Sequence, residues 1–409
     1  MGQLYVPDGT WTLCSNGKKI LKIQVTSQAT VKIEGGKLAA TEKDRFDGNF
    51  VCPPMMAAGA LVGAVLAGAL VASGPALVVF AAGFAGAVGG GTVLANHLPS
   101  VCSLLCRSNE WTALHPKVKL EKKRALLENA TLTCMFGGLV TLKMPNYQES
   151  IDMGLLAGVQ VYRERGGDDD YKELTPKEQA RLADYDTLTP KQIKTLGLNP
   201  NLFGEDGDSG YHAELYRNKK TGTYVVAFRG TQSGKDTLED GLQGTGISSE
   251  YYNKAADLAK KMKDNPRFSA QNTIFTGHSL GGGMAATAGG ASGFPTYTYN
   301  AAGVHDATLK RNQVYRKDMN HVQAYNSDND ILNAVQDSRE GVLKTLGFVG
   351  KLVGKTKGLP RAAGERMELE TDNMVMQGKS FGHAAINAVK ALEREAAAAA
   401  SRTVKAKTQ

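Results

Sequence analysis

One serine lies in a sequence context that is typical of a nucleophile. Residues 273–283 read TIFTGHSLGGG, so an apolar run leads into G-x-S-x-G around Ser279 and then into small residues. This order predicts a strand, a sharp turn and a helix, which together present a serine hydroxyl beside a helix N-terminus. Gly277 and Gly281 flank the serine because such a turn leaves no room for larger side chains. A chance glycine turn is the alternative, and the strand-like and helix-like flanks favour the nucleophile.

A serine nucleophile needs a general base, and chain order reduces the candidates to one histidine. In α/β-hydrolases the acid and then the histidine follow the serine along the chain. The seven histidines are His97, His115, His212, His278, His305, His321 and His383. Only His383 follows both the serine and the acidic candidates, so we expect it to be the base. Its alternative role is that of a capping or surface histidine beside the last predicted helix, residues 384–395.

Two aspartates compete for the role of the acid that orients the base. Asp328 and Asp330 follow the strand-like run at 321–325, and this fold places its third catalytic member on a loop after a strand. Each could instead be a solvated turn carboxylate or a helix cap. We favour Asp330, because Ile331 and Leu332 could bury that side of the loop, and we keep Asp328 as the alternative.

Four motifs in a fixed order resemble the class 3 lipases. They are residues 224–231 (YVVAFRGT), 235–240 (KDTLED), 277–282 (GHSLGG) and 329–331 (NDI). The resemblance covers about residues 151–392, and it implies an α/β-hydrolase whose Ser-His-Asp mechanism needs no metal or organic cofactor. It also implies that Thr231, the residue after the Arg-Gly pair, contributes to the oxyanion hole. The N–H of Leu280 would be the second donor, since it follows the nucleophile. After the acid, NDILNAV replaces the family's usual proline-containing segment, which puts the acid assignment in question.

Length and composition predict more than one domain. The chain has 409 residues, of which 42% are hydrophobic and 22% charged, as is typical of globular proteins with sizeable cores. Short alternating runs with glycine turns predict one small β-rich domain over residues 1–143, interrupted by an insertion. We expect a linker at 144–150, the α/β-hydrolase domain at 151–395, and a flexible tail at 396–409.

The insertion is an uncharged apolar segment. No Asp, Glu, Lys or Arg occurs between Asp47 and Arg107. Two stretches, 55–73 and 76–95, approach or reach the length that spans a bilayer. We therefore predict an apolar helical hairpin at 51–97 that can enter a membrane as transmembrane helices. The alternatives are a buried soluble hairpin and a flexible Gly/Ala linker. The first residues lack a basic start and an apolar run, so no signal peptide is predicted.

Charge and cysteine usage narrow the set of partners. The net charge is +8, but the basic residues are scattered without interleaved aromatics, so an anionic membrane surface is at least as good a partner as nucleic acid. The alternative is that the charge serves only solubility. All five cysteines lie in the first third of the chain: Cys14, Cys52, Cys102, Cys106 and Cys134. We expect buried free thiols. The alternative is zinc at Cys102 and Cys106 with a nearby histidine.

The N-terminal segments resemble PAAR-like spike-tip proteins of bacterial type VI secretion. The matching pieces are residues 5–9 (YVPDG), 12–17 (TLCSNG) and 126–138 (LLENATLTCMFGG). The resemblance implies a cone of short strands that caps a trimeric spike and carries a fused effector. Together with the lipase-like region, the apolar hairpin and the basic charge, it predicts a secreted antibacterial phospholipase that acts at the periplasm or inner membrane of a target cell. Its partners would be membrane phospholipid, a spike protein bound through residues 1–143, and a cognate immunity protein. The alternatives are a neutral-lipid esterase, and a spike adapter or membrane-inserting protein with an inactive hydrolase.

Overall fold

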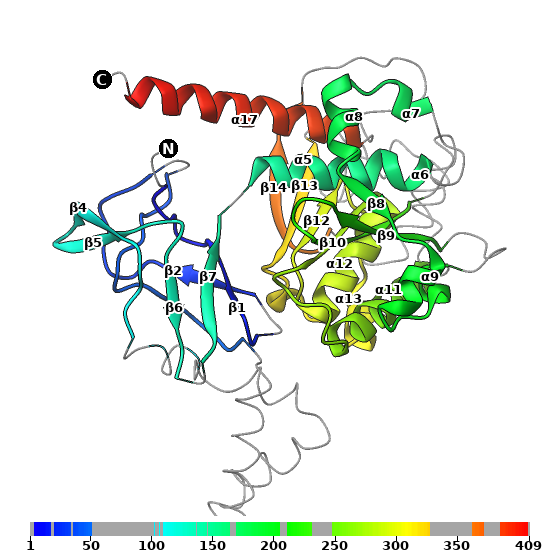
Figure 1. Cartoon of the computed structure of the whole chain (residues 1–409), viewed down its shortest axis with the longest axis horizontal. Helices are drawn as coiled ribbons and strands as arrows, with labels where there is room; N and C mark the ends of the chain where they lie inside the picture. The colour runs from blue at the N-terminus through cyan, green and yellow to red at the C-terminus, as the bar shows by residue number, and fades with distance from the viewer. Residues whose placement is uncertain are drawn as a thin grey trace, which may run out of the picture. The chain divides into compact units, whose positions relative to one another are not determined.

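The chain divides into two compact units, residues 1–145 and 146–409 (Figure 1). The computed structural model describes residues 4–17, 20–33, 36–50, 102, 106, 109–135, 137–144, 146–163, 169–204, 211–230, 248–327, 362–371 and 385–407. Each unit has its own sheet and its own core, so each is described by itself.

The N-terminal unit is built on a five-stranded antiparallel sheet of order β3-β2-β1-β7-β6. Its strands are β1 (Trp11–Cys14), β2 (Leu21–Gln24), β3 (Arg45–Phe46), β6 (Thr131–Thr133) and β7 (Leu139–Lys143). β1 pairs with β7, so segments more than a hundred residues apart in the sequence form one sheet. The strands β4 (Leu114–Leu120) and β5 (Lys123–Leu126) form a separate hairpin. The β-rich character expected of this region is confirmed.

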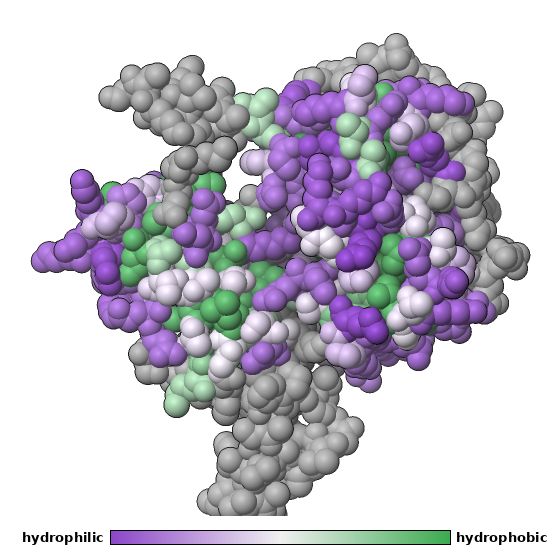
Figure 2. All heavy atoms as spheres, viewed as in Figure 1, coloured by the Kyte–Doolittle hydropathy of each residue, from purple (hydrophilic) through white to green (hydrophobic). Residues whose placement is uncertain are grey.

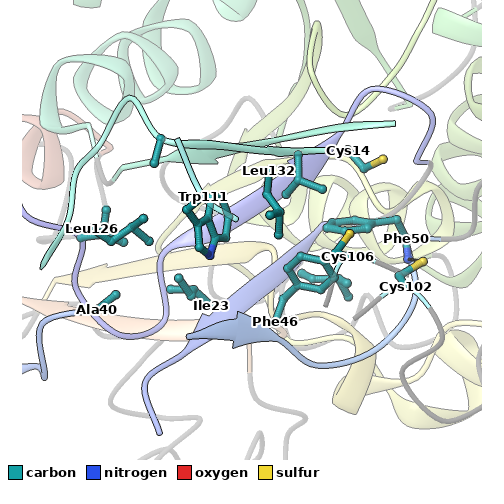
Figure 3. Close-up of a cluster of buried hydrophobic side chains, with 14 residues drawn as sticks. Cys14, Ile23, Ala40, Phe46, Phe50, Cys102, Cys106, Trp111, Leu126 and Leu132 are labelled. Carbon is teal, nitrogen blue, oxygen red and sulfur yellow. Dashed lines mark hydrogen bonds between the residues drawn. The ribbon is translucent and has the colours of Figure 1, made fainter. Parts of the chain in front are cut away.

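The core of this unit combines aliphatic and aromatic side chains with buried thiols (Figure 3). The indole N–H of Trp111 donates to the carbonyl of Asp44 at 2.9 Å, and the Asp44 carboxylate accepts from the backbone N–H of Thr26 and Thr41. The side chains of Cys14, Cys102 and Cys106 are buried. Burial raises the pKa of the Cys106 thiol to about 12, which keeps it protonated at neutral pH.

The N-terminal unit was expected to contain an apolar helical hairpin, with a zinc site as the alternative to buried thiols. The predicted apolar hairpin at 51–97 lies outside the described residues. Among the helices that are described, none combines the length and apolarity needed to cross a membrane. The described side chains also include no group of three or more His, Cys, Asp or Glu residues able to hold a metal ion.

The C-terminal unit contains a seven-stranded sheet of order β14-β13-β12-β11-β10-β9-β8. Its strands are β8 (Tyr185–Thr187), β9 (Ala213–Asn218), β10 (Tyr224–Phe228), β11 (Thr273–His278), β12 (Thr296–Tyr299), β13 (Val322–Ser327) and β14 (Glu365–Leu369). The strands β10 to β14 run parallel, whereas β8 and β9 are antiparallel additions at one edge. The carboxyl ends of β10 to β13 therefore meet at one edge of the sheet, which is where ligands bind in open α/β sheets.

Helices cover both faces of this sheet. The helices described in this unit are α5 (Tyr147–Leu155), α6 (Val161–Arg163), α7 (Asp169–Lys172), α8 (Pro176–Leu182), α9 (Pro190–Thr195), α11 (Ser248–Asp264), α12 (Leu280–Ser292), α13 (Asp306–Arg311) and α17 (Ala385–Lys407). A π-helix, η3 (Leu156–Gln160), and the 3₁₀ helices η4 (Pro200–Phe203) and η5 (Arg316–Asp318) are also described. Thr276 on β11 donates its hydroxyl to the carbonyl of Met153 on α5, whereas Gly277 lies against α12 at Gly281. Because successive strand residues face opposite sides, α5 and α12 cover opposite faces of the sheet. Hydrophilic residues dominate the exposed side of this unit in the view of Figure 2.

Neighbouring residues determine where several helices begin. The first and last helices of the unit, however, extend beyond the bounds expected from the sequence. Thr175 and Thr189 each form a complete capping box with proline in the first turn. The helix α5 begins at Tyr147 under an Asn146 cap, so half of the segment expected to be a linker is helical. The helix α17 continues to Lys407, into the region expected to be a flexible tail. Its alanine-rich sequence has high helix propensity, which accounts for the extension.

Candidate active site

Ser279 occupies a strained turn between β11 and α12. Its φ is +56° and its ψ is −126°, a region that non-glycine residues rarely adopt and that costs about 1–3 kcal/mol. The residue is 6% exposed and stands at the N-cap position of α12. Strain of this kind persists only where the surrounding structure enforces it, and it clusters at functional sites. The strand, turn and helix predicted from the sequence are all present.

The two flanking glycines are required by close backbone contacts. A Cβ atom on Gly277 would lie 2.1 Å from the carbonyl oxygen of Gly281. A Cβ atom on Gly281 would lie 2.2 Å from the carbonyl oxygen of Phe228, at the end of β10. The obstacles are backbone atoms that cannot rotate away. The first turn of α12 thus packs directly onto β10 and β11, which fixes the direction in which the helix leaves the sheet.

Hydrogen bonds hold the main chain of Ser279 to the segment that follows β12. The Ser279 N–H donates to the carbonyl of Tyr299 at 3.1 Å, and the Ala302 N–H donates to the carbonyl of Ser279 at 2.9 Å. The same carbonyl accepts from Gly283 at 3.2 Å, which is the first helical bond of α12. Leu280, the second expected oxyanion donor, is the first residue of α12, where backbone N–H groups lack partners within the helix.

The other side of the turn is formed by the end of β10. The N–H of Gly230 donates to the hydroxyl of Tyr162 at 3.0 Å. A Cβ atom on Gly230 would lie 2.9 Å from the carbonyl oxygen of His278 and 3.5 Å from the Cβ of Ser279. Gly230 is therefore in direct contact with the serine turn. Thr231, the expected oxyanion residue that follows it in the chain, lies outside the described residues.

The acid and base candidates also lie outside the description, but their chain neighbours are placed. Ser327 ends β13, one residue before Asp328 and three before Asp330. Ala385 begins α17, two residues after His383, and packs against Gly158 of the π-helix. Of the six expected site residues, the structure thus places Ser279 and Leu280. The catalytic roles of all six stay predictions.

Buried tyrosines attach α5 to the sheet beneath the site. The hydroxyl of Tyr299 donates to the carbonyl of Ser150, and the Ser150 and Tyr325 hydroxyls lie 2.9 Å apart. Burial raises the pKa of Tyr299 and of Tyr325 well above the usual value for a phenol, so both hydroxyls stay protonated and able to donate. This network holds the helix that leads into Tyr162.

Two residues of the site region were not found by sequence reasoning. Tyr162 accepts a hydrogen bond from Gly230 beside the serine turn, and Asn300 accepts one from Ser327 at the end of β13, so each joins distant segments. Asn300 carried a weak signal, since asparagine after a strand often adopts positive φ. Tyr162 carried none, because its role depends on the irregular helix that precedes it.

Comparison with known protein families agrees with this geometry. Residues 157–382, more than half of the chain, match the model of the Tle-like phospholipase domain. The chain belongs to the family of the Tle-like phospholipase domain. Residues 6–146 match a second model, described as a domain of unknown function (DUF4280). The phospholipase model covers Ser279 and every strand of the seven-stranded sheet.

Two individual proteins resemble parts of the chain. An extracellular phospholipase A1 of Serratia liquefaciens is 34% identical over 171 residues, which are 40% of this chain and 52% of the relative. The chain thus spans about half the length of that relative. The crystal structure of Lip2 lipase from Yarrowia lipolytica aligns with 55% of this chain and 78% of its own, at 14% identity and a TM-score of 0.34.

Proposed function

We propose that this chain cleaves an acyl ester of membrane phospholipid, with Ser279 as the nucleophile. The observation that carries the proposal is the strained conformation of Ser279 at the N-terminus of α12. A serine held this way has its hydroxyl beside backbone N–H groups that can bind a developing negative charge. Membership in the phospholipase family and the name of the Serratia relative support a phospholipid as the substrate.

In the proposed mechanism, His383 removes the Ser279 proton as Oγ attacks the ester carbonyl carbon. The N–H groups of Thr231 and Leu280 bind the oxyanion, each contributing about 10²–10³ in rate. The intermediate collapses, the C–O bond breaks, and His383 protonates the departing lysophospholipid oxygen. Water, deprotonated by His383, then attacks the acyl-enzyme, releasing the fatty acid and restoring the serine.

The nucleophile is tested with phospholipid vesicles whose two acyl chains carry different labels. Ser279→Ala should lower fatty-acid release by more than about 10³-fold. Ser292→Ala is the matched control, since Ser292 is a buried serine at the other end of α12 whose hydroxyl bonds backbone carbonyls. It should retain activity. Equal rates for Ser279→Ala and the unmodified protein would refute the proposal. A triacylglycerol emulsion, tested in parallel, separates phospholipase from neutral-lipid esterase.

The acid is proposed to be Asp330, and it is tested against Asp328. Each is changed to Asn, which preserves size but cannot hold the imidazole in the required tautomer. Asp330→Asn should lower kcat on the order of 10⁴-fold, whereas Asp328→Asn should stay within about tenfold. The opposite pattern would assign the role to Asp328.

Delivery is a separate proposal. We infer that residues 1–143 dock the enzyme on a type VI secretion spike, that 51–97 enters a membrane, and that an immunity protein protects the producer. The β-rich N-terminal unit and the extracellular relative support export. Killing of neighbouring bacteria should require both a working secretion apparatus and Ser279, and a protein from the adjacent gene should suppress it. Killing that persists without the apparatus would overturn this part.

A further inference from the structure

Asn300 lies between the serine turn and the strand that leads to the acid candidates. It follows β12 directly, is fully buried and has a φ of +43°. Positive φ is uncommon outside glycine, and asparagine is among the few residues that tolerate it. The position therefore combines a backbone requirement with a buried amide side chain.

The side chain of Asn300 bonds the last residue of β13. The Oδ1 atom accepts from the N–H of Ser327 at 2.8 Å, and the backbone N–H of Asn300 donates to the carbonyl of Tyr325 at 2.9 Å. Ser327 is 1% exposed, so the bond is made out of contact with water. Two hydrogen bonds thus fix the end of β13 one residue before Asp328 and three before Asp330.

The chain neighbours of Asn300 hold the nucleophile. Tyr299 accepts from the Ser279 N–H, and Ala302 donates to the Ser279 carbonyl. In addition, a Cβ atom on Gly282 would lie 2.7 Å from the Cβ of Ala301, so this segment packs tightly against the first turn of α12. Residues 299–302 therefore connect the main chain of Ser279 with the main chain of Ser327.

We propose that Asn300 is a positioning residue that fixes the end of β13, from which the acid candidates follow in the chain, relative to Ser279. This inference rests on the proposed Ser-His-Asp mechanism. Without the Oδ1 acceptor, the end of β13 loses a fixed point, and the carboxylate no longer holds the imidazole in one place. A displacement of about 1 Å at such a site can cost on the order of 10²-fold in rate.

Asn300→Gly is the informative variant, because glycine keeps the positive φ and removes only the side chain. The assay uses the full chain and a soluble p-nitrophenyl ester, with kcat, KM and the pH dependence of kcat/KM as readouts. We expect kcat to fall by roughly 10- to 100-fold with KM within about twofold. On the acidic side, kcat/KM rises with pH as the imidazole of the proposed base, His383, loses its proton; we call this part of the profile the acid limb. It should move to lower pH, because a nearby carboxylate raises the pKa of an imidazole and displacement of the carboxylate lowers that pKa.

Asn218→Gly is the matched control. Asn218 is a buried asparagine at the end of β9, three strands away from β12, where its Oδ1 accepts from the N–H groups of Lys220 and Thr221. It should lower the melting temperature and leave the acid limb unchanged. Asn300→Asp supplies a second variant that retains an acceptor oxygen. Its acid limb should lie at or above that of the unmodified protein, since an added carboxylate raises the imidazole pKa.

The outcomes separate this inference from the proposed function. An Asn300→Gly protein with unchanged kcat and acid limb overturns the positioning role. So does a loss of activity that accompanies a lower melting temperature without any movement of the acid limb. An Asn300→Asp protein whose acid limb moves to lower pH also overturns it. By contrast, full activity in Ser279→Ala would refute the proposed function itself, whatever Asn300→Gly does.

Discussion

The hydroxyl of Tyr162 accepts a hydrogen bond from the backbone N–H of Gly230 at 3.0 Å. This bond joins α6, just after the π-helical turn, to the end of β10, where Gly230 touches the serine turn. Single π-helical turns inside α-helices occur often at functional sites, because they re-aim the side chains that follow. Here the turn places a tyrosine hydroxyl beside the residue that precedes the proposed oxyanion donor.

Tyr162→Phe should therefore impair catalysis more than binding. The buried Gly230 N–H would lose its acceptor, which costs about 1–3 kcal/mol of stability, and the adjacent donor would be held less firmly. We expect kcat to fall about tenfold with KM nearly unchanged. Tyr171→Phe is the control, since the Tyr171 ring stacks under the Arg163 guanidinium at 3.9 Å through its face, not its hydroxyl. Equal kcat in both variants would show that the hydroxyl of Tyr162 is dispensable.

Gly158 should be intolerant of any side chain. A Cβ atom there would lie 2.3 Å from the Cβ of Ala385, the first residue of α17. Gly158→Ala should cost about 1–3 kcal/mol in urea unfolding and reduce activity, because α17 begins two residues after His383. The double variant with Ala385→Gly removes the clash and should recover most of the loss. Additive losses in the double variant would contradict the contact.

Replacing a glycine by alanine should be more harmful in the serine turn than late in α12. Gly277→Ala meets a backbone oxygen, so it should abolish activity and destabilise the fold. Gly290→Ala is the comparison: its Cβ would lie 2.3 Å from a methyl group of Val314, a side chain that can shift. Its effect should be limited to about 1–3 kcal/mol, measured by urea unfolding. An active, fully stable Gly277→Ala protein would mean that the turn is not held as described.

The carboxyl of Asp152 should make the free energy of unfolding depend on pH with a sign opposite to that of most acidic groups. It forms an ion pair with Arg181 at 2.6 Å, yet burial raises its pKa above the ordinary value of 3.8. The folded protein then binds the proton more readily than the unfolded one, so this group's contribution to stability falls as pH rises through the window just above that value. The free energy of unfolding of Asp152→Asn, relative to the unmodified protein, should rise over the same window. An opposite slope would show that the ion pair dominates over burial.

Features that depend on neighbouring residues could be predicted from the sequence, whereas features that depend on distant residues could not. The strand and helix around Ser279 and the capping boxes at Thr175 and Thr189 follow from neighbouring residues. Asn300 and Tyr162 could not be assigned roles in advance, because each acts through a partner more than twenty residues away. The helix α5 was missed at its start, since the Asn146 cap that defines it lies in a segment without apolar periodicity.

Helix α17 packs on α5 and on the π-helix through two glycines, Gly154 against Val389 and Gly158 against Ala385. Helix α5 is the first element of this unit, and the residues of α17 that pack on it are added by the ribosome more than two hundred positions later. Ser279 is synthesised long before that cover exists. A nascent or truncated chain that stops short of Val389 would thus carry the nucleophile on an unfinished domain, so the order of synthesis itself delays assembly of the hydrolase.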